Sequence, residues 1–163
     1  MSGPRSSLVA AILTVSLLSG CFVLVPVPTR APVSTGTVES PGATDSFGAA
    51  LNSERAASGL APLSRNTRLT AAAQAHAQDM AARGYLAHTS PDGVSYTARM
   101  RAHGYRNCLA AEAISRGIRS TGHALQSWMD SPPHRSLLMH PQVQEYGVGE
   151  SDGYWALVLA SPC

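Results

Sequence analysis

The dipeptide Asp152-Gly153 constrains the fold of this chain more than any other feature. It separates two apolar stretches, QEYGVGES and YWALVLASP, and a two-residue step of this kind is the strongest short signal for a β-hairpin. The earlier part of the chain carries helical signals instead, in segments 45–59, 64–84, 95–105, 120–131 and 134–141. Helices followed by a terminal hairpin predict an α+β domain in which helices pack on a small sheet.

Segment 64–84 carries the clearest helical pattern. Its apolar face repeats at helical spacing, and Gly84 ends the pattern with the residue that most often closes a helix. His76 lies on this apolar face together with Leu69 and Met80. We expect His76 to be a core histidine whose ring is hydrogen-bonded, rather than a ligand.

The first twenty residues are organised like a secretory signal peptide. Arg5 supplies a positive charge, and the apolar run LVAAILTVSLL (8–18) follows it. A helix of this length extends about 17 Å, too short for a hydrocarbon core of roughly 30 Å. The run ends in LSGC (18–21), which resembles a bacterial lipobox, so we expect cleavage before Cys21 and diacylglycerol on its thiol. The alternative is simple cleavage near Gly20, which would release a soluble protein.

The two other cysteines are Cys108 and Cys163. If Cys21 carries lipid, they remain as a pair outside the cytoplasm, where disulfides persist. We therefore expect a Cys108–Cys163 disulfide. For so long a loop, chain-entropy models predict that it stabilises the folded state by roughly 4 kcal/mol. Two unpaired thiols are the alternative.

Residues 21–44 are expected to be a tether. The part from 26 to 44 is rich in proline, serine and threonine and cannot bury a core, so folding is confined to residues 45–163. The hydrophobic content of 44% is ordinary for a globular protein. The basic residues are all arginines, the net charge is only +2 and no basic stripe occurs. Nucleic acid is therefore not an expected partner.

Six pieces of the domain occur in an order that resembles a known family. They are LNSERAASGLAPLSRNTRLTAAAQAHAQDMAARGYLAHTSPDG, RMRAHGY, AEAISRG, WMDSPPHRSLLMHP, EYGVG and YWALVLA. Together, over about residues 47–160, they resemble the CAP superfamily of cysteine-rich secretory, antigen 5 and pathogenesis-related 1 proteins, also called the SCP domain. The resemblance is greatest to short bacterial members with SPxHR. It implies an α-β-α sandwich with helices on both sides of a small antiparallel sheet and with a central cleft.

The same resemblance implies a cleft of histidines and acids. His88, in the loop AHTSPDG, matches the first family histidine, and Glu112 matches the acid of the EN motif. His134 belongs to the bacterial SPxHR pattern and is the candidate for a second imidazole. The sequence departs from the plant and animal pattern at Ala113, Ser131 and Tyr154, where those members have asparagine, a second acid and a second histidine. The candidate set is therefore His88, Glu112 and His134.

Two histidines and a glutamate suffice as a first shell for Zn²⁺ or another divalent metal, which we expect to bind weakly. The sequence has no nucleophile elbow, HExxH motif or phosphate loop, and it does not show a reaction. Our main hypothesis is an exported, lipid-anchored bacterial protein that binds a small or lipidic ligand, with or without a divalent metal, in the His88–Glu112–His134 cleft. The first alternative is an extracellular hydrolase, a peptidase or cell-wall enzyme that uses metal-bound or histidine-activated water. The second is a structural surface module.

Overall fold

A computed structural model describes residues 46–163. The expected signal peptide, the lipidation site Cys21, the tether and Asp45 lie outside the described residues. The elements follow in the order α1 (Ser46–Ala57), β1 (Ser64–Arg65), α2 (Thr67–Arg83), α3 (Tyr96–Ala102), β2 (Asn107–Ser115), α4 (Thr121–Met129), α5 (Pro132–Leu138), β3 (Glu145–Ser151) and β4 (Tyr154–Pro162).

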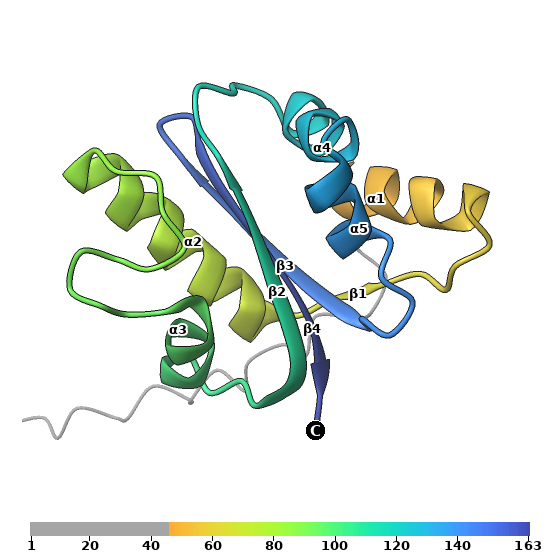
Figure 1. Cartoon of the computed structure of the whole chain (residues 1–163), viewed down its shortest axis with the longest axis horizontal. Helices are drawn as coiled ribbons and strands as arrows, with labels where there is room; N and C mark the ends of the chain where they lie inside the picture. The colour runs from red at the N-terminus through yellow and green to blue at the C-terminus, as the bar shows by residue number, and fades with distance from the viewer. Residues whose placement is uncertain (1–45) are drawn as a thin grey trace, which may run out of the picture. The chain divides into compact units, whose positions relative to one another are not determined.

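The domain is an α-β-α sandwich, which confirms the predicted architecture (Figure 1). Its four strands form one sheet in the order β1-β3-β4-β2. Helices α2 and α3 cover one face, and α1, α4 and α5 cover the other. The sheet is mixed rather than purely antiparallel, because the short strand β1 pairs in parallel with β3.

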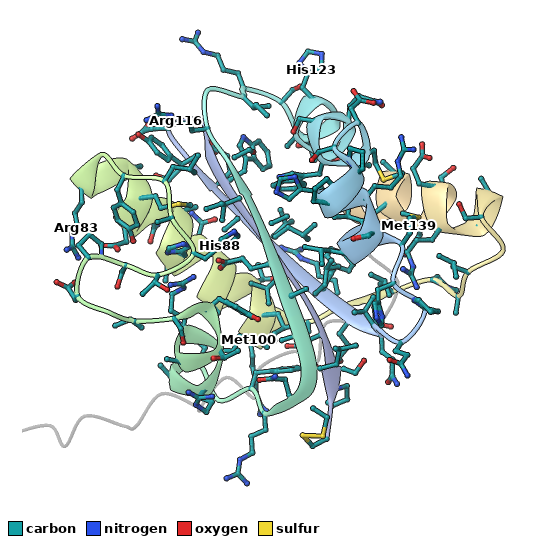
Figure 2. The ribbon with its side chains drawn as sticks, in the orientation of Figure 1. Arg83, His88, Met100, Arg116, His123 and Met139 are labelled. Carbon is teal, nitrogen blue, oxygen red and sulfur yellow. A yellow bond between two sulfur atoms is a disulfide. The ribbon has the colours of Figure 1, made fainter. Side chains whose placement is uncertain are left out.

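Strand β4 divides the core into two layers, because successive side chains of a strand point to opposite faces. Leu157 and Leu159 pack with the helices α1, α4 and α5. Ala156, Val158 and Ala160 pack with α2 and α3, where Met100 of α3 is also fully buried (Figure 2). Side chains therefore fill both faces of the sheet. In the neighbouring strands, too, side chains alternate between the two faces.

Helix α2 lies unusually close to β3. An added Cβ at Gly147 would be 2.1 Å from the carbonyl carbon of Leu69, and one at Gly149 would be 2.3 Å from the backbone nitrogen of Gln74. Only glycine leaves room for backbone to approach so closely. Gln74 also hydrogen-bonds the backbone of Glu150 through both ends of its amide, which holds α2 to the edge of β3.

Local chemistry sets the ends of several of these elements. The predicted hairpin is confirmed: Asp152 and Gly153 both have positive φ, at 49° and 78°, as a type I′ turn requires. Gly84 ends α2 in the left-handed conformation. The predicted helix start at residue 64 is wrong, because residues 64–65 form β1 and the side chain of Asn66 caps α2 instead. An asparagine oxygen that accepts two backbone N–H groups is a strong helix start.

Strand β2 was not predicted from the sequence. Its residues NCLAAEAIS are rich in alanine, which has little preference for strands, and they show no polar alternation, because helices cover both faces. The strand pairs with β4 along most of its length, and Glu112 lies opposite Val158. Glu112 therefore lies on the face that α2 and α3 cover.

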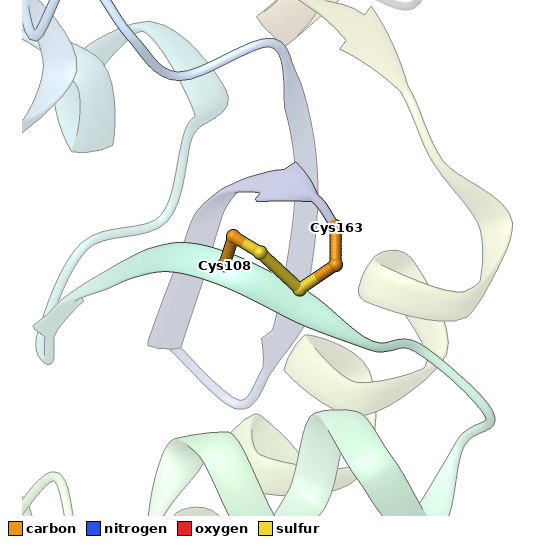
Figure 3. The surroundings of a disulfide bond; sticks show 2 residues. All are labelled: Cys108 and Cys163. Carbon is orange, nitrogen blue, oxygen red and sulfur yellow. A yellow bond between two sulfur atoms is a disulfide. The ribbon is translucent and has the colours of Figure 1, made fainter.

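The disulfide between Cys108 and Cys163 is present, as predicted (Figure 3). It joins the beginning of β2 to the residue after β4 and closes a loop of 55 residues. The two strands are already hydrogen-bonded neighbours, so the bridge ties their ends together. Within residues 46–163, none of the helices combines the length and the apolar character needed to cross a bilayer.

Candidate functional site

The loop between α2 and α3, residues 84–95, presents His88. Its turn is the predicted one: Gly93 has φ +80° and donates its N–H to the carbonyl of Ser90, 2.8 Å away. Arg83 pairs with Asp92 and so fastens the turn to the end of α2. The loop is thus held by its own backbone and by a salt bridge, and the His88 side chain, 51% exposed, projects from it beside β2 (Figure 2).

Glu112 of β2 is the partner of His88. Its Oε1 lies 2.9 Å from Nδ1 of His88, and its side chain is only 1% exposed. Burial raises the pKa of Glu112, and this effect is opposed by Arg99 and His88. An ionised carboxylate only accepts hydrogen bonds, so Nδ1 of His88 then donates to Glu112, and in the neutral ring Nε2 keeps its lone pair. The pair therefore joins a buried carboxylate to a half-exposed imidazole.

Arg99 of α3 completes this arrangement. Its guanidinium donates to Oε2 of Glu112 at 2.7 Å and to the carbonyl oxygens of His88 and Val94 at 3.0 and 2.9 Å. Sequence reasoning missed Arg99. The only available signal was indirect: a carboxylate in an apolar segment needs a positive partner, but the chain has many arginines and none stands out by its spacing.

His76 of α2 lies behind the pair. It is fully buried, as predicted for a core histidine, and its Nε2 is 2.9 Å from the carbonyl oxygen of Ala87 and 4.0 Å from Oε1 of Glu112. Because a carbonyl only accepts, Nε2 carries the proton and Nδ1 is a buried acceptor with no partner in the described part of the chain. Burial and the nearby Arg99 lower the pKa of His76 to about 4. His76 is therefore neutral at neutral pH.

The structure does not bring His134 to this site. His134 lies in α5, on the face of the sheet opposite α2, and its Nδ1 is 2.9 Å from the hydroxyl of Ser131. Ala113, the position after the glutamate, points into the core on that same opposite face. Of the three expected residues, the structure thus brings together His88 and Glu112. Arg99, which was not expected, is the third residue of the site.

These residues do not fit a metal ion. Both oxygens of Glu112 and Nδ1 of His88 are engaged with each other or with Arg99, which leaves the lone pair of Nε2 of His88 as the single position open to a metal. Among residues 46–163, no group of three histidine, cysteine, aspartate or glutamate side chains is placed to hold a metal. The expected weak metal site therefore lacks the three ligands that a zinc site uses.

The site is also not an open cleft at Glu112, whose carboxylate is covered. Two surface hollows lie elsewhere, around the β3–β4 turn, and Thr121, Glu150 and Trp155 line both of them. The part of the candidate site that a ligand can reach is the exposed edge of His88 and its loop. Leu86 and Val94, the two exposed large apolar side chains of the described domain, belong to this loop.

Comparison with known proteins decides the family. Residues 49–154 match the model of the cysteine-rich secretory protein family, CAP, and so cover more than half of the chain. The chain belongs to the CAP family. A curated relative, the uncharacterized protein YkwD of Bacillus subtilis, is 34% identical over 106 residues, which are 64% of this chain and 41% of YkwD.

Solved structures of other proteins share the fold. An extracellular protein with an SCP domain from Bacillus anthracis superposes with a TM-score of 0.68 at 26% identity, over 70% of this chain and 38% of that one. An outer surface protein of Borrelia burgdorferi superposes with a TM-score of 0.64 at 18% identity, over 71% of this chain and 89% of that one, and at this identity supports the fold alone. The chain thus spans less than half the length of both Bacillus relatives.

Proposed function

We propose that this CAP domain binds a small or lipidic ligand at His88. The single observation that carries the proposal is the contact between Nδ1 of His88 and the buried carboxylate of Glu112. Burying a carboxylate costs free energy, and a purely structural surface module would not need a buried carboxylate at this position. Here the buried group orients an imidazole whose other nitrogen is left to the solvent side.

The chemistry of this imidazole limits what it can bind. With Nδ1–H donated to Glu112, Nε2 is an acceptor, so the ligand should bring an O–H or N–H donor. The ionised Glu112 is balanced by Arg99, so the site offers little net charge to attract an ion. The exposed Leu86 and Val94 on the same loop favour a ligand with an apolar part.

The experiment incubates the purified protein with a bacterial lipid extract and identifies retained molecules by native mass spectrometry. The wild type should retain a defined molecule, and His88→Ala should lose it. His123→Ala, which changes an exposed histidine on α4, should retain it as the wild type does. Equal retention by all three proteins would exclude His88 as the binding residue, and retention by none would exclude a lipidic ligand.

We also propose that the domain is exported and held at the membrane by lipid on Cys21. The lipobox-like LSGC after an apolar run supports the proposal, as does the description of the Bacillus anthracis structural relative as extracellular. Two acyl chains give stable anchoring, whereas one is marginal. The wild type should partition into detergent, and Cys21→Ser should be released or remain unprocessed. An unchanged distribution of the variant would contradict anchoring through this thiol.

A hydrolase is the second candidate, and the same contact favours it. A carboxylate that orients an imidazole with a free Nε2 is the arrangement of a general base that activates water. Peptide, ester and cell-wall substrates should be tested with and without Zn²⁺. Turnover that is lost in Glu112→Gln and independent of Zn²⁺ would support hydrolysis by a histidine-activated water. No turnover of any of these substrates would favour the binding function.

A further inference from the structure

The strongest unexplained feature of the site is Arg99, because its guanidinium gathers oxygens from three separate places. These are Oε2 of Glu112 on β2 and the backbone carbonyls of His88 and Val94, which delimit the turn of the loop. A carboxylate and two carbonyl oxygens that converge on one positive group resemble the ligand set of a hard cation. The position that such a cation would take is occupied by a side chain.

We propose that Arg99 is the resident cation of the His88–Glu112 site and the residue that positions His88. Its guanidinium neutralises the buried carboxylate and fixes both ends of the turn, so the site is complete without a bound metal ion. The expectation of a metal was drawn from a candidate set that included His134, which the fold places on the other face. The inference deepens the proposed function, on which it rests for calling this a binding site.

The electrostatics of the neighbours support the assignment. Glu112 is 1% exposed and Arg99 11%, so their charges face each other with little water between them. His76, on α2, is a third basic side chain near Glu112, beside Arg99 and His88, and it is neutral because burial lowers its pKa to about 4. Asp79, also on α2, is engaged with Tyr85 and Arg83. Arg99 is thus the permanent positive charge among the described contacts of Glu112.

The geometry also explains why arginine is used. A guanidinium is a planar fork whose donors diverge, so a single group can reach a carboxylate and two carbonyls at once. A lysine at this position would bring the same charge as a single point on a flexible stem. Arg99 therefore does two tasks that a lysine would separate: it balances Glu112 and it holds the backbone from which His88 projects.

The test reads the tautomer of His88 directly, without any ligand. The protein, with Cys21→Ser to avoid lipid attachment, is labelled with ¹⁵N, and long-range proton–nitrogen spectra report which ring nitrogen carries the proton. The wild type should show Nδ1–H. Arg99→Ala should lose most of this form, because Glu112 is no longer held ionised beside His88. Arg101→Ala, which changes an exposed arginine on the same helix, should keep the wild-type spectrum.

Chemical rescue separates the cation from a general loss of packing. Millimolar guanidinium should restore the Nδ1–H signal in Arg99→Ala, whereas the same concentration of sodium chloride should not. A folded Arg99→Ala with the wild-type tautomer would overturn the proposal, and so would a lost signal that guanidinium does not restore. If Arg99→Ala does not fold, Arg99→Lys provides the test: His88 signals and loop amide exchange both unchanged from the wild type would also overturn it. Failure of ligand binding alone would leave these spectra unchanged, so the two proposals can fail separately.

Discussion

The close contact between α2 and β3 predicts that a single methyl group at Gly147 destabilises the domain. In Gly147→Ala the new Cβ would lie 2.1 Å from the carbonyl carbon of Leu69 and 2.2 Å from the backbone nitrogen of Thr70, whereas ordinary contacts begin at 3.4 Å. Both neighbours are backbone atoms, so no side chain can rotate away. Helix α2 would have to retreat by about 1 Å along this contact.

The expected cost is at or above the upper end of the range for overpacked cores, about 3 kcal/mol. For a domain of this size, that loss corresponds to roughly 10 °C in Tm. Urea and thermal unfolding measure it. Gly149→Ala should behave alike and should also disturb the functional site, because its Cβ would meet the backbone of Gln74, two residues before His76.

Gly122→Ala is the matched control. Gly122 lies in α4, where an added Cβ meets nothing within 4 Å. Alanine is the better helix former there, so this variant should be equally stable or gain up to about 1 kcal/mol. A Gly147→Ala protein that melts within a degree of the wild type would refute the claim that glycine is needed for the approach of α2.

Three further predictions concern two buried side chains and the disulfide. The folded-state pKa of His76, about 4, lies below its unfolded value of 6.5, so its contribution to the free energy of unfolding is present above pH 6.5 and is lost as the pH falls toward 4. Between neutral pH and pH 4, urea titrations should show that the wild type loses up to about 3 kcal/mol more than His76→Gln. Equal losses in the two proteins would contradict this prediction. Arg55 is fully buried and donates to the carbonyls of Ala61, Leu138 and His140. Arg55→Met should therefore lower the free energy of unfolding by about 3 kcal/mol in the same assay. A change within error of zero would be evidence that these hydrogen bonds do not stabilise the domain. Replacing Cys108 and Cys163 together by serine should cost roughly 4 kcal/mol, and unchanged stability would show that strand pairing alone holds these ends.

The site illustrates how far sequence reasoning reaches. His88 and Glu112 were both identified through the family resemblance, and the structure places them in contact. Arg99 could not be found in this way, because α3 and β2 are brought together only by packing across the sheet face. His134 was expected beside them, but nothing in its local pattern indicates which face its helix covers.

The end of α2 and the terminal hairpin were determined by the sequence alone. Gly84 and the Asp152-Gly153 turn act through their own backbone preferences, so neighbours in the chain are sufficient to place them. The tertiary structure decided which charged groups meet. In a strand, one residue separates one face from the other, so Glu112 faces α2 and α3 while Ala113 faces the helices on the side of His134. Which helix covers which face depends on the packing of the whole sheet, and no local pattern contains that information.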